Sequence, residues 1–247
     1  MDRLQLDKNA KLTGRVYFKD EIMLLGLSGS GASFTFDGTK LVLKLKGDNI
    51  AVGNNPIDYA RIAVYVDGKR VIDEIIDCAE KEVTVIDRTE NAQSVVEIIK
   101  LSESPMSAVG IEAFAEGSAE TLPEKPLKIE FIGDSITCGY GVDDEDENHQ
   151  FTTATEDVTK AYAYKTAKAL DAEYSMFSAS GYGIVSGYTE GDEPISEQTI
   201  PQFYCSYGFS RGNFAGTAPQ DIPWDFSKYI PQIIVINLGT NDDSYCR

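Results

Sequence analysis

The feature that most constrains the fold of this chain is a change in its hydrophobic pattern near residue 125. Before this point, apolar and polar residues alternate in short runs, which is the period expected of strands with one buried face. After it, strand-like runs are separated by helical or long connecting segments, and one of them, Ile233–Leu238, is a continuous apolar run typical of a strand buried on both faces. The sequence therefore predicts an all-β part followed by an α/β part.

The first half contains about eight short strand-like runs and no long helical pattern, which is typical of a β-sandwich, here of the jelly-roll type. Two dipeptides that favour hairpin turns, Asp37-Gly38 and Asp67-Gly68, each separate two such runs. We therefore predict a β-sandwich over residues 1–120. The clearest strand-like runs are Ser33–Asp37, Leu41–Leu45, Arg61–Val66, Arg70–Ile72, Val83–Ile86, Val95–Leu101 and Val109–Phe114.

A polar stretch, residues 116–125, ends the β part and is followed by Pro126. Polar residues next to prolines are typical of a linker. We therefore expect a linker at residues 121–127 and a second domain at residues 128–247.

The second half predicts an α/β layer with a parallel sheet, because its strands are separated by helical or long connecting segments. A helix is expected over Thr153–Leu170, because Thr153 and Glu156 have the spacing of a capping box. Three strands are recognisable here. They are Leu127–Ile132, Ala172–Ser178 and Ile233–Leu238.

Composition excludes several classes of function. Forty acidic residues against 22 Lys and Arg give a net charge of −18, which argues against nucleic acid or anionic lipid as a partner. No apolar run reaches the ~18 residues of a membrane span. The N-terminus has no signal peptide, although a secreted protein whose signal had been removed would look the same, so the compartment stays open.

Cysteine and histidine are too few and too scattered for a zinc pattern, so we expect no metal and no cofactor. The sequence is compatible with a disulfide between Cys205 and Cys246 and with two free thiols. Cys138 fits a small packed residue better than a reactive thiol.

Chemistry-bearing residues follow each of the three predicted strands. Ser135 follows the first, Gly181 lies in a loop of small residues after the second, and Asn241 follows the third. Because parallel strands present their carboxyl ends at one edge of a sheet, we expect these residues to meet there. A nucleophile with backbone and amide donors for an oxyanion is what acyl transfer requires.

At these residues the chain resembles the SGNH (GDSL-like) hydrolase superfamily. Gly133–Thr137 matches its first block, Gly181 its second and Gly239–Asp242 its third. The preceding jelly roll and three further stretches narrow the resemblance to carbohydrate esterase family 2, whose members are acetyl esterases acting on polysaccharides such as xylan and glucomannan. These stretches are Ala154–Tyr164, Ser178–Ile184 and Trp224–Tyr229.

The resemblance implies a nucleophilic Ser135 and an oxyanion hole made by the N–H groups of Ser135 and Gly181 and by the Asn241 side chain. It also implies a three-layer α/β/α domain, whose sheet normally has five strands where three are recognised here, and a general-base histidine in an Asp-x-x-His motif after the last strand. The single histidine of this chain is His149, in an acidic loop that would favour its protonated form, so we expect a solvated surface residue. We therefore expect a further C-terminal segment, of ~100 residues on typical domain sizes, to carry the base.

Several interpretations stay open. Tyr182 and Trp224 could stack on sugar rings or pack in the core. Asp134 fits a residue that holds a turn by accepting backbone N–H groups. The expected substrate is a neutral acetylated carbohydrate. The rivals are a carbohydrate-binding protein that has lost catalysis, and another acyl hydrolase such as a lipase or thioesterase, which would need an apolar acyl pocket that the polar residues 179–217 do not suggest.

Overall fold

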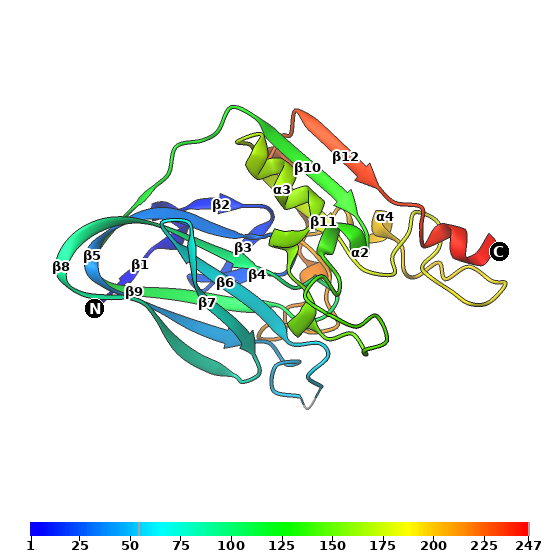
Figure 1. The fold of residues 1–247 in the computed structure, drawn as a ribbon, viewed down its shortest axis with the longest axis horizontal. Coiled ribbons are helices and arrows are strands. Elements are labelled where there is room, and N and C mark those ends of the chain that lie inside the picture. Colours follow the sequence, from blue (N-terminus) through cyan, green and yellow to red (C-terminus); the bar gives the residue numbers. More distant parts are fainter. Residues whose placement is uncertain (54, 247) are drawn as a thin grey trace.

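The computed structural model describes residues 1–53 and 55–246. Figure 1 shows a β-rich part built from the first half of the chain and a smaller part in which a short helix lies against three strands. The N-terminus lies in the β-rich part and the C-terminus at the far end of the smaller part (Figure 1).

The β-rich part is an antiparallel sheet with the strand order β3-β4-β9-β5-β8-β6-β7, to which β1 adds on β9 and β2 on β5. Its core is formed by the apolar residues that alternate along the strands, such as Phe34, Phe36 and Leu41. The elements are β1 (Asp2–Leu4), α1 (Leu6–Asn9), β2 (Lys11–Thr13), β3 (Val16–Lys19), β4 (Ile22–Leu25), β5 (Gly31–Gly47), β6 (Ala60–Val66), β7 (Lys69–Ile76), β8 (Glu80–Lys100) and β9 (Val109–Thr121).

One of the two predicted hairpins is confirmed and the other is wrong. Asp67 and Gly68, with φ of 51° and 77°, turn the chain between β6 and β7. Asp37-Gly38 instead lies inside β5, which continues through a shift in register between Gly38 and Lys40. Gly38 is needed there for close approach of two strands, because a Cβ on it would lie 2.7 Å from the Cα of Gly117.

The β strands are also longer than predicted. One strand, β8, contains both Val83–Ile86 and Val95–Leu101, except that Leu101 lies just beyond its end. Residues 116–121, which their polar composition placed in the linker stretch, belong to β9 and pair with β5. The segment without regular structure between β9 and the next strand is residues 122–127.

The second part contains a parallel three-stranded sheet of order β11-β10-β12, and its strands confirm the three predicted ones. Its main helix is α3, and among the described residues no helix is long and apolar enough to cross a membrane. The elements are β10 (Lys128–Gly133), α2 (Ser135–Cys138), η1 (Thr153–Thr155), η2 (Val158–Lys160), α3 (Tyr162–Ala169), β11 (Glu173–Ser178), α4 (Ile200–Phe203), η3 (Pro219–Asp221), η4 (Phe226–Lys228), β12 (Ile233–Asn237) and η5 (Asp242–Cys246), where η denotes a 3-10 helix.

The predicted helix Thr153–Leu170 is wrong in its first half. Within this range α3 is the one α-helix, and two short 3-10 helices, η1 and η2, precede it. The reason is that this segment bonds to the β-rich part: the Val158 N–H donates to the Leu101 carbonyl, and the Glu156 carboxylate accepts the N–H of Glu103. Glu156 is therefore buried in a contact between the two parts and is not a helix cap.

The two parts share one apolar core. Ala63 and Ile99, from β6 and β8, pack in the same cluster as Phe131 of β10 and Met176 of β11. The opposite face of the small sheet is covered by α4 and the loop after it, where Phe209 packs near Phe177. Both faces of β10 and β11 are thus buried. For β12 the prediction is wrong among the described residues: its continuous apolar run predicted burial on both faces, but Ile233, Ile234 and Ile236 are exposed because the strand pairs on one side alone.

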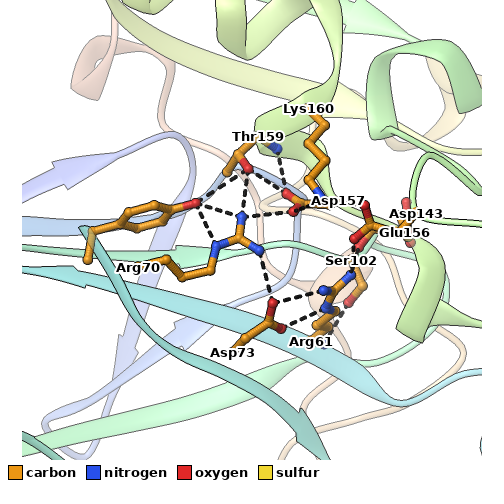
Figure 2. Close-up of polar contacts among 10 residues, drawn as sticks. Arg61, Arg70, Asp73, Ser102, Asp143, Glu156, Asp157, Thr159 and Lys160 are labelled. Atoms are coloured by element: carbon orange, nitrogen blue, oxygen red, sulfur yellow. Dashed lines mark hydrogen bonds and ion pairs between the residues drawn. The ribbon is translucent and has the colours of Figure 1, made fainter. Parts of the chain in front are cut away.

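A polar network reinforces this contact (Figure 2). Arg61 of β6 donates to Asp143 at 3.0 Å and to the carbonyl oxygen of Glu156 at 3.1 Å, and Arg70 of β7 donates to Asp157 at 2.8 Å. These hydrogen bonds fix the segment that precedes α3 against the edge of the β-rich sheet.

Candidate active site

The register of the parallel sheet brings the three predicted site residues to one edge. Gly133, the last residue of β10, is level with Ser178 of β11 and with Asn237 of β12. Ser135, Gly181 and Asn241 come two to four residues beyond these positions, in the loops that leave the same edge. The meeting of strand ends predicted from the sequence is therefore present.

Ser135 is the first residue of the short helix α2 and is half-buried. The preceding Asp134 is buried and accepts the Ile136 N–H at 3.1 Å, so it holds the turn as predicted. Gly133 allows this tight turn, because a Cβ there would lie 1.9 Å from the Thr137 hydroxyl. The side chain of Ser135 is thereby held at the carboxyl end of the central strand.

The Gly181 loop is held by hydrogen bonds from the N–H groups of the two residues that precede its glycine. The Ala179 N–H donates to the carbonyl of Gly133 at 3.2 Å, and the Ser180 N–H donates to the Glu103 carboxylate at 2.6 Å. Gly181 itself has a φ of 79°, in the left-handed region that favours glycine. A loop shaped in this way presents its N–H groups at the strand ends.

Asn241 is buried and bonds directly to the Gly181 loop. Its Nδ2 donates to the Tyr182 carbonyl at 2.8 Å. A side-chain amide has two N–H donors, so this bond leaves one to serve an oxyanion.

Asp242 anchors the next part of the same loop, a role that the sequence analysis missed. Its carboxylate accepts the N–H groups of Ile184, Val185 and Ser186 at 2.7–3.1 Å. Partial burial opposes its ionisation, but these backbone donors outweigh burial and lower the pKa of Asp242 below its ordinary value. The Gly-Thr-Asn-Asp sequence was the available signal, although nothing local in it identified the partners of the carboxylate.

A group of buried titratable residues adjoins the Gly181 loop, and the sequence analysis did not single it out as a group. Burial raises the pKa values of the Glu103 and Glu156 carboxyls and of the Cys138 thiol, and it lowers the pKa of Lys100 to about 8. Possible metal-ligand atoms of Glu103, Cys138 and Glu156 lie within 4.8 Å of one another. The packed Cys138 agrees with its prediction.

The aromatic candidates lie in different surroundings. Tyr182 is half-buried and its ring packs against those of Phe203 and Phe209, with centroids 6.1 and 5.0 Å away. Trp224 lies over the buried guanidinium of Arg15, whose Cζ is 5.3 Å from the indole centroid. Sugar stacking by either ring stays a prediction.

His149 is not brought to the site by any contact among the described residues. Its side chain is 64% exposed, and its Nδ1 lies 2.8 Å from Asp144 Oδ1, within the acidic loop. This is the solvated position predicted for it. Cys205 and Cys246 are both free and exposed.

A central parallel strand that ends in a serine, with a glycine loop and an asparagine on the neighbouring strand ends, is the arrangement of the SGNH (GDSL-like) hydrolases. More specifically, residues 12–126 match the family model described as carbohydrate esterase 2 N-terminal. The chain as a whole resembles carbohydrate esterases of family 2.

Two curated relatives carry this resemblance. The cellulase/esterase CelE of Acetivibrio thermocellus is 32% identical over 220 residues, which are 88% of this chain and 24% of that protein. An acetylxylan esterase / glucomannan deacetylase of Cellvibrio japonicus is 29% identical over 245 residues, 96% of this chain and 62% of that protein. The chain thus spans less than two thirds of the length of either relative.

Solved structures give the same family. A family two carbohydrate esterase from Clostridium thermocellum, in complex with cellohexaose, is 28% identical and superposes with a TM-score of 0.77 over 95% of this chain and 67% of that one. A family two carbohydrate esterase from Cellvibrio japonicus, 24% identical, shares the fold with a TM-score of 0.80.

Proposed function

We propose that this protein is a serine esterase, or the larger part of one, that removes acetyl groups from carbohydrate such as xylan, glucomannan or their oligosaccharides. The observation that carries the proposal is the convergence of Ser135, Gly181 and Asn241 at one edge of the parallel sheet. The names of the relatives, an acetylxylan esterase / glucomannan deacetylase among them, supply the substrate class.

In the proposed reaction the Ser135 hydroxyl attacks the carbonyl carbon of the acetyl ester while a base takes its proton. The negative charge on the carbonyl oxygen is stabilised by the N–H groups of Ser135 and Gly181 and by the free N–H of Asn241. The base then gives this proton to the sugar oxygen, which leaves as a hydroxyl group. Water hydrolyses the resulting acetyl-serine and releases acetate. No step in this sequence requires a metal or cofactor.

We propose that the base is a histidine on a further C-terminal segment that packs against β12. Three isoleucines of β12, Ile233, Ile234 and Ile236, are 44, 53 and 63% exposed. Among the described residues β12 pairs on one side alone, with β10. An apolar strand with a free edge calls for a covering element.

Within this proposal, residues 1–120 form a jelly-roll sandwich, residues 121–127 a linker, and residues 128–247 the larger part of a three-layer α/β/α domain. The long strands β5, β8 and β9 around one core support the sandwich. The burial of both faces of β10 and β11, by α3 on one side and by α4 on the other, supports the three layers.

The experiment is acetate release from acetylated xylan and glucomannan oligosaccharides by the full-length protein, compared with its hydrolysis of 4-nitrophenyl esters of increasing acyl length. We expect release from the oligosaccharides and a preference for acetyl over long acyl groups. Rapid hydrolysis of long acyl esters would favour the lipase or thioesterase interpretation. Binding of cello-oligosaccharides without any acetate release would favour a carbohydrate-binding protein, a possibility to which the cellohexaose complex of one relative points.

A further inference from the structure

A buried carboxyl pair lies beside the Gly181 loop and has no part in the reaction described above. Glu103 comes from the segment between β8 and β9, and Glu156 from the segment between η1 and η2. Both side chains are fully buried, as are those of Lys100 and Cys138 next to them. Burying charged groups is costly, so an arrangement of this kind needs a physical reason.

The hydrogen bonds link this pair to the loop. The Ser180 N–H donates to Glu103 Oε2 at 2.6 Å, and the N–H of Glu103 donates to Glu156 Oε2 at 3.0 Å. The second oxygen of each carboxyl, Oε1, is buried without a hydrogen-bond partner among the described residues. One oxygen of each carboxyl lies within 4.8 Å of the other, so a proton on one of the two groups would relieve the repulsion between them and turn one acceptor into a donor.

The charges point to the same proton. Lys100 donates to the carbonyls of Ser102 and Glu103 and supplies a positive charge beside the pair, and the Asp48 carboxylate and the Arg61 guanidinium also act on this cluster. Two carboxylates in one buried cluster cannot both ionise readily away from water. A proton on one of them removes their mutual repulsion. A metal ion on Glu103, Cys138 and Glu156 is disfavoured, because the neighbouring ammonium of Lys100 would repel it.

The proton belongs on Glu156. Glu103 accepts the Ser180 N–H and lies 3.8 Å from the Cys138 thiol, so its ionised form receives the donors that stabilise it. Glu156, which faces the charge of Glu103, is the better place for the O–H.

We propose that Glu103 is a positioning residue for the oxyanion loop: the pair holds one proton, on Glu156, and Glu103, as the ionised member, holds the Ser180 N–H. This inference rests on the proposed esterase function. The bond fixes the Ala179–Ser180 peptide and thereby restrains the neighbouring Ser180–Gly181 peptide, which carries the Gly181 N–H. Loosening it weakens stabilisation of the transition state and leaves substrate binding largely intact.

The test uses the full-length protein with Glu103→Gln, Glu156→Ala and Glu156→Gln, and with Glu80→Gln as a matched surface control, since Glu80 is 46% exposed. Glu103→Gln replaces a charged acceptor by a neutral one, so we expect kcat to fall about tenfold with KM within about twofold. Glu156→Ala removes the proton of the pair and should lower kcat similarly. Glu156→Gln restores a donor to Glu103 and should recover most of the loss.

A second readout does not depend on turnover. Hydrogen exchange of the Ser180 amide, followed by NMR at several pH values, should quicken about tenfold or more in Glu103→Gln, with no change in Glu80→Gln. An unchanged Ser180 amide in a folded Glu103→Gln protein overturns the positioning role, even if esterase activity is intact. A wild-type protein without Ser135-dependent turnover instead overturns the proposed function, and the catalytic role of Glu103 with it. The two failures are distinguishable, because the first is seen in amide exchange and the second in turnover.

Discussion

Arg15 shows at the scale of one residue how the two parts of the molecule are joined. Its side chain is fully buried, donates to the carbonyls of Tyr204 and Ser206 at 2.6 Å each, and lies 3.4 Å from Glu130. The ring of Phe177 lies under its guanidinium, with the centroid 4.4 Å from Cζ. No local pattern around Arg15 predicts that it is buried.

We expect Arg15→Met to destabilise the protein by about 3–5 kcal/mol, because it removes the positive charge from the buried Glu130 carboxylate, which keeps only the Tyr204 hydroxyl as a donor among the described residues, and the Arg15 donors from two carbonyls. Urea unfolding measures this loss. Lys125→Met is the matched control: its partner Asp171 is 85% exposed, so the change should cost at most about 1 kcal/mol. Equal costs for the two variants would contradict this account of Arg15.

The proposed reaction gives Asn241 a side-chain N–H for the oxyanion, beside its bond to the Tyr182 carbonyl. Asn241→Ala removes both, and on this proposal we expect kcat to fall by about 10²–10³ with KM nearly unchanged. Steady-state kinetics on an acetyl ester measure both constants, and Asn148→Ala, in the exposed acidic loop, is the control. A rise in KM with kcat preserved would show that Asn241 binds substrate instead.

At the scale of elements, the Asp242 carboxylate holds residues 184–186, and this hold depends on pH. Because the folded state lowers its pKa, the ionised form stabilises the loop above the unfolded-state pKa, and the stabilisation is lost as pH falls through the folded-state pKa. We expect the exchange of these amides, corrected for intrinsic rates, to accelerate below about pH 4. Asp242→Asn should show fast exchange already at neutral pH. A wild-type loop with exchange independent of pH would contradict this role.

The elements differ in how far the sequence could predict them. The strands β10, β11 and β12 were predictable because their apolar residues carry the signal within a few positions, although β12 is exposed where its sequence predicted burial. The lack of an α-helix before α3 was not predictable, because Glu156 and Val158 bond to residues about 55 positions earlier in the chain. The Asp37-Gly38 turn failed for a similar reason, since the glycine serves an approach to β9 that a local pattern cannot reveal.

At the scale of the whole molecule, the shared core implies that the two parts unfold together. Ile99 lies on β8 and packs in the cluster that includes Phe131 of β10. We expect Ile99→Ala to lower stability by about 2–5 kcal/mol and to shift the fluorescence transition of Trp224, in the other part, together with the circular dichroism transition. Val95→Ala, on an exposed position of the same strand, is the control. Two separate transitions would contradict the shared core.

The site was predictable from the sequence to the extent that it depends on strand ends. Ser135, Gly181 and Asn241 each follow a strand with a clear signal, and the parallel register then brings them together. Glu103 was not predictable, because it lies 77 residues from its partner Ser180 and on the other part of the chain. Residues that hold a site through tertiary contacts carry no local pattern.

The central claim is that Ser135 is the nucleophile, and covalent labelling tests it most directly. The full-length protein is treated with an organophosphate ester, which phosphorylates an activated serine, and the modified peptide is identified by mass spectrometry. We expect one adduct per chain, on the peptide that contains Ser135, and none in Ser135→Ala. An adduct on another serine, or esterase activity that survives in Ser135→Ala, would contradict the account.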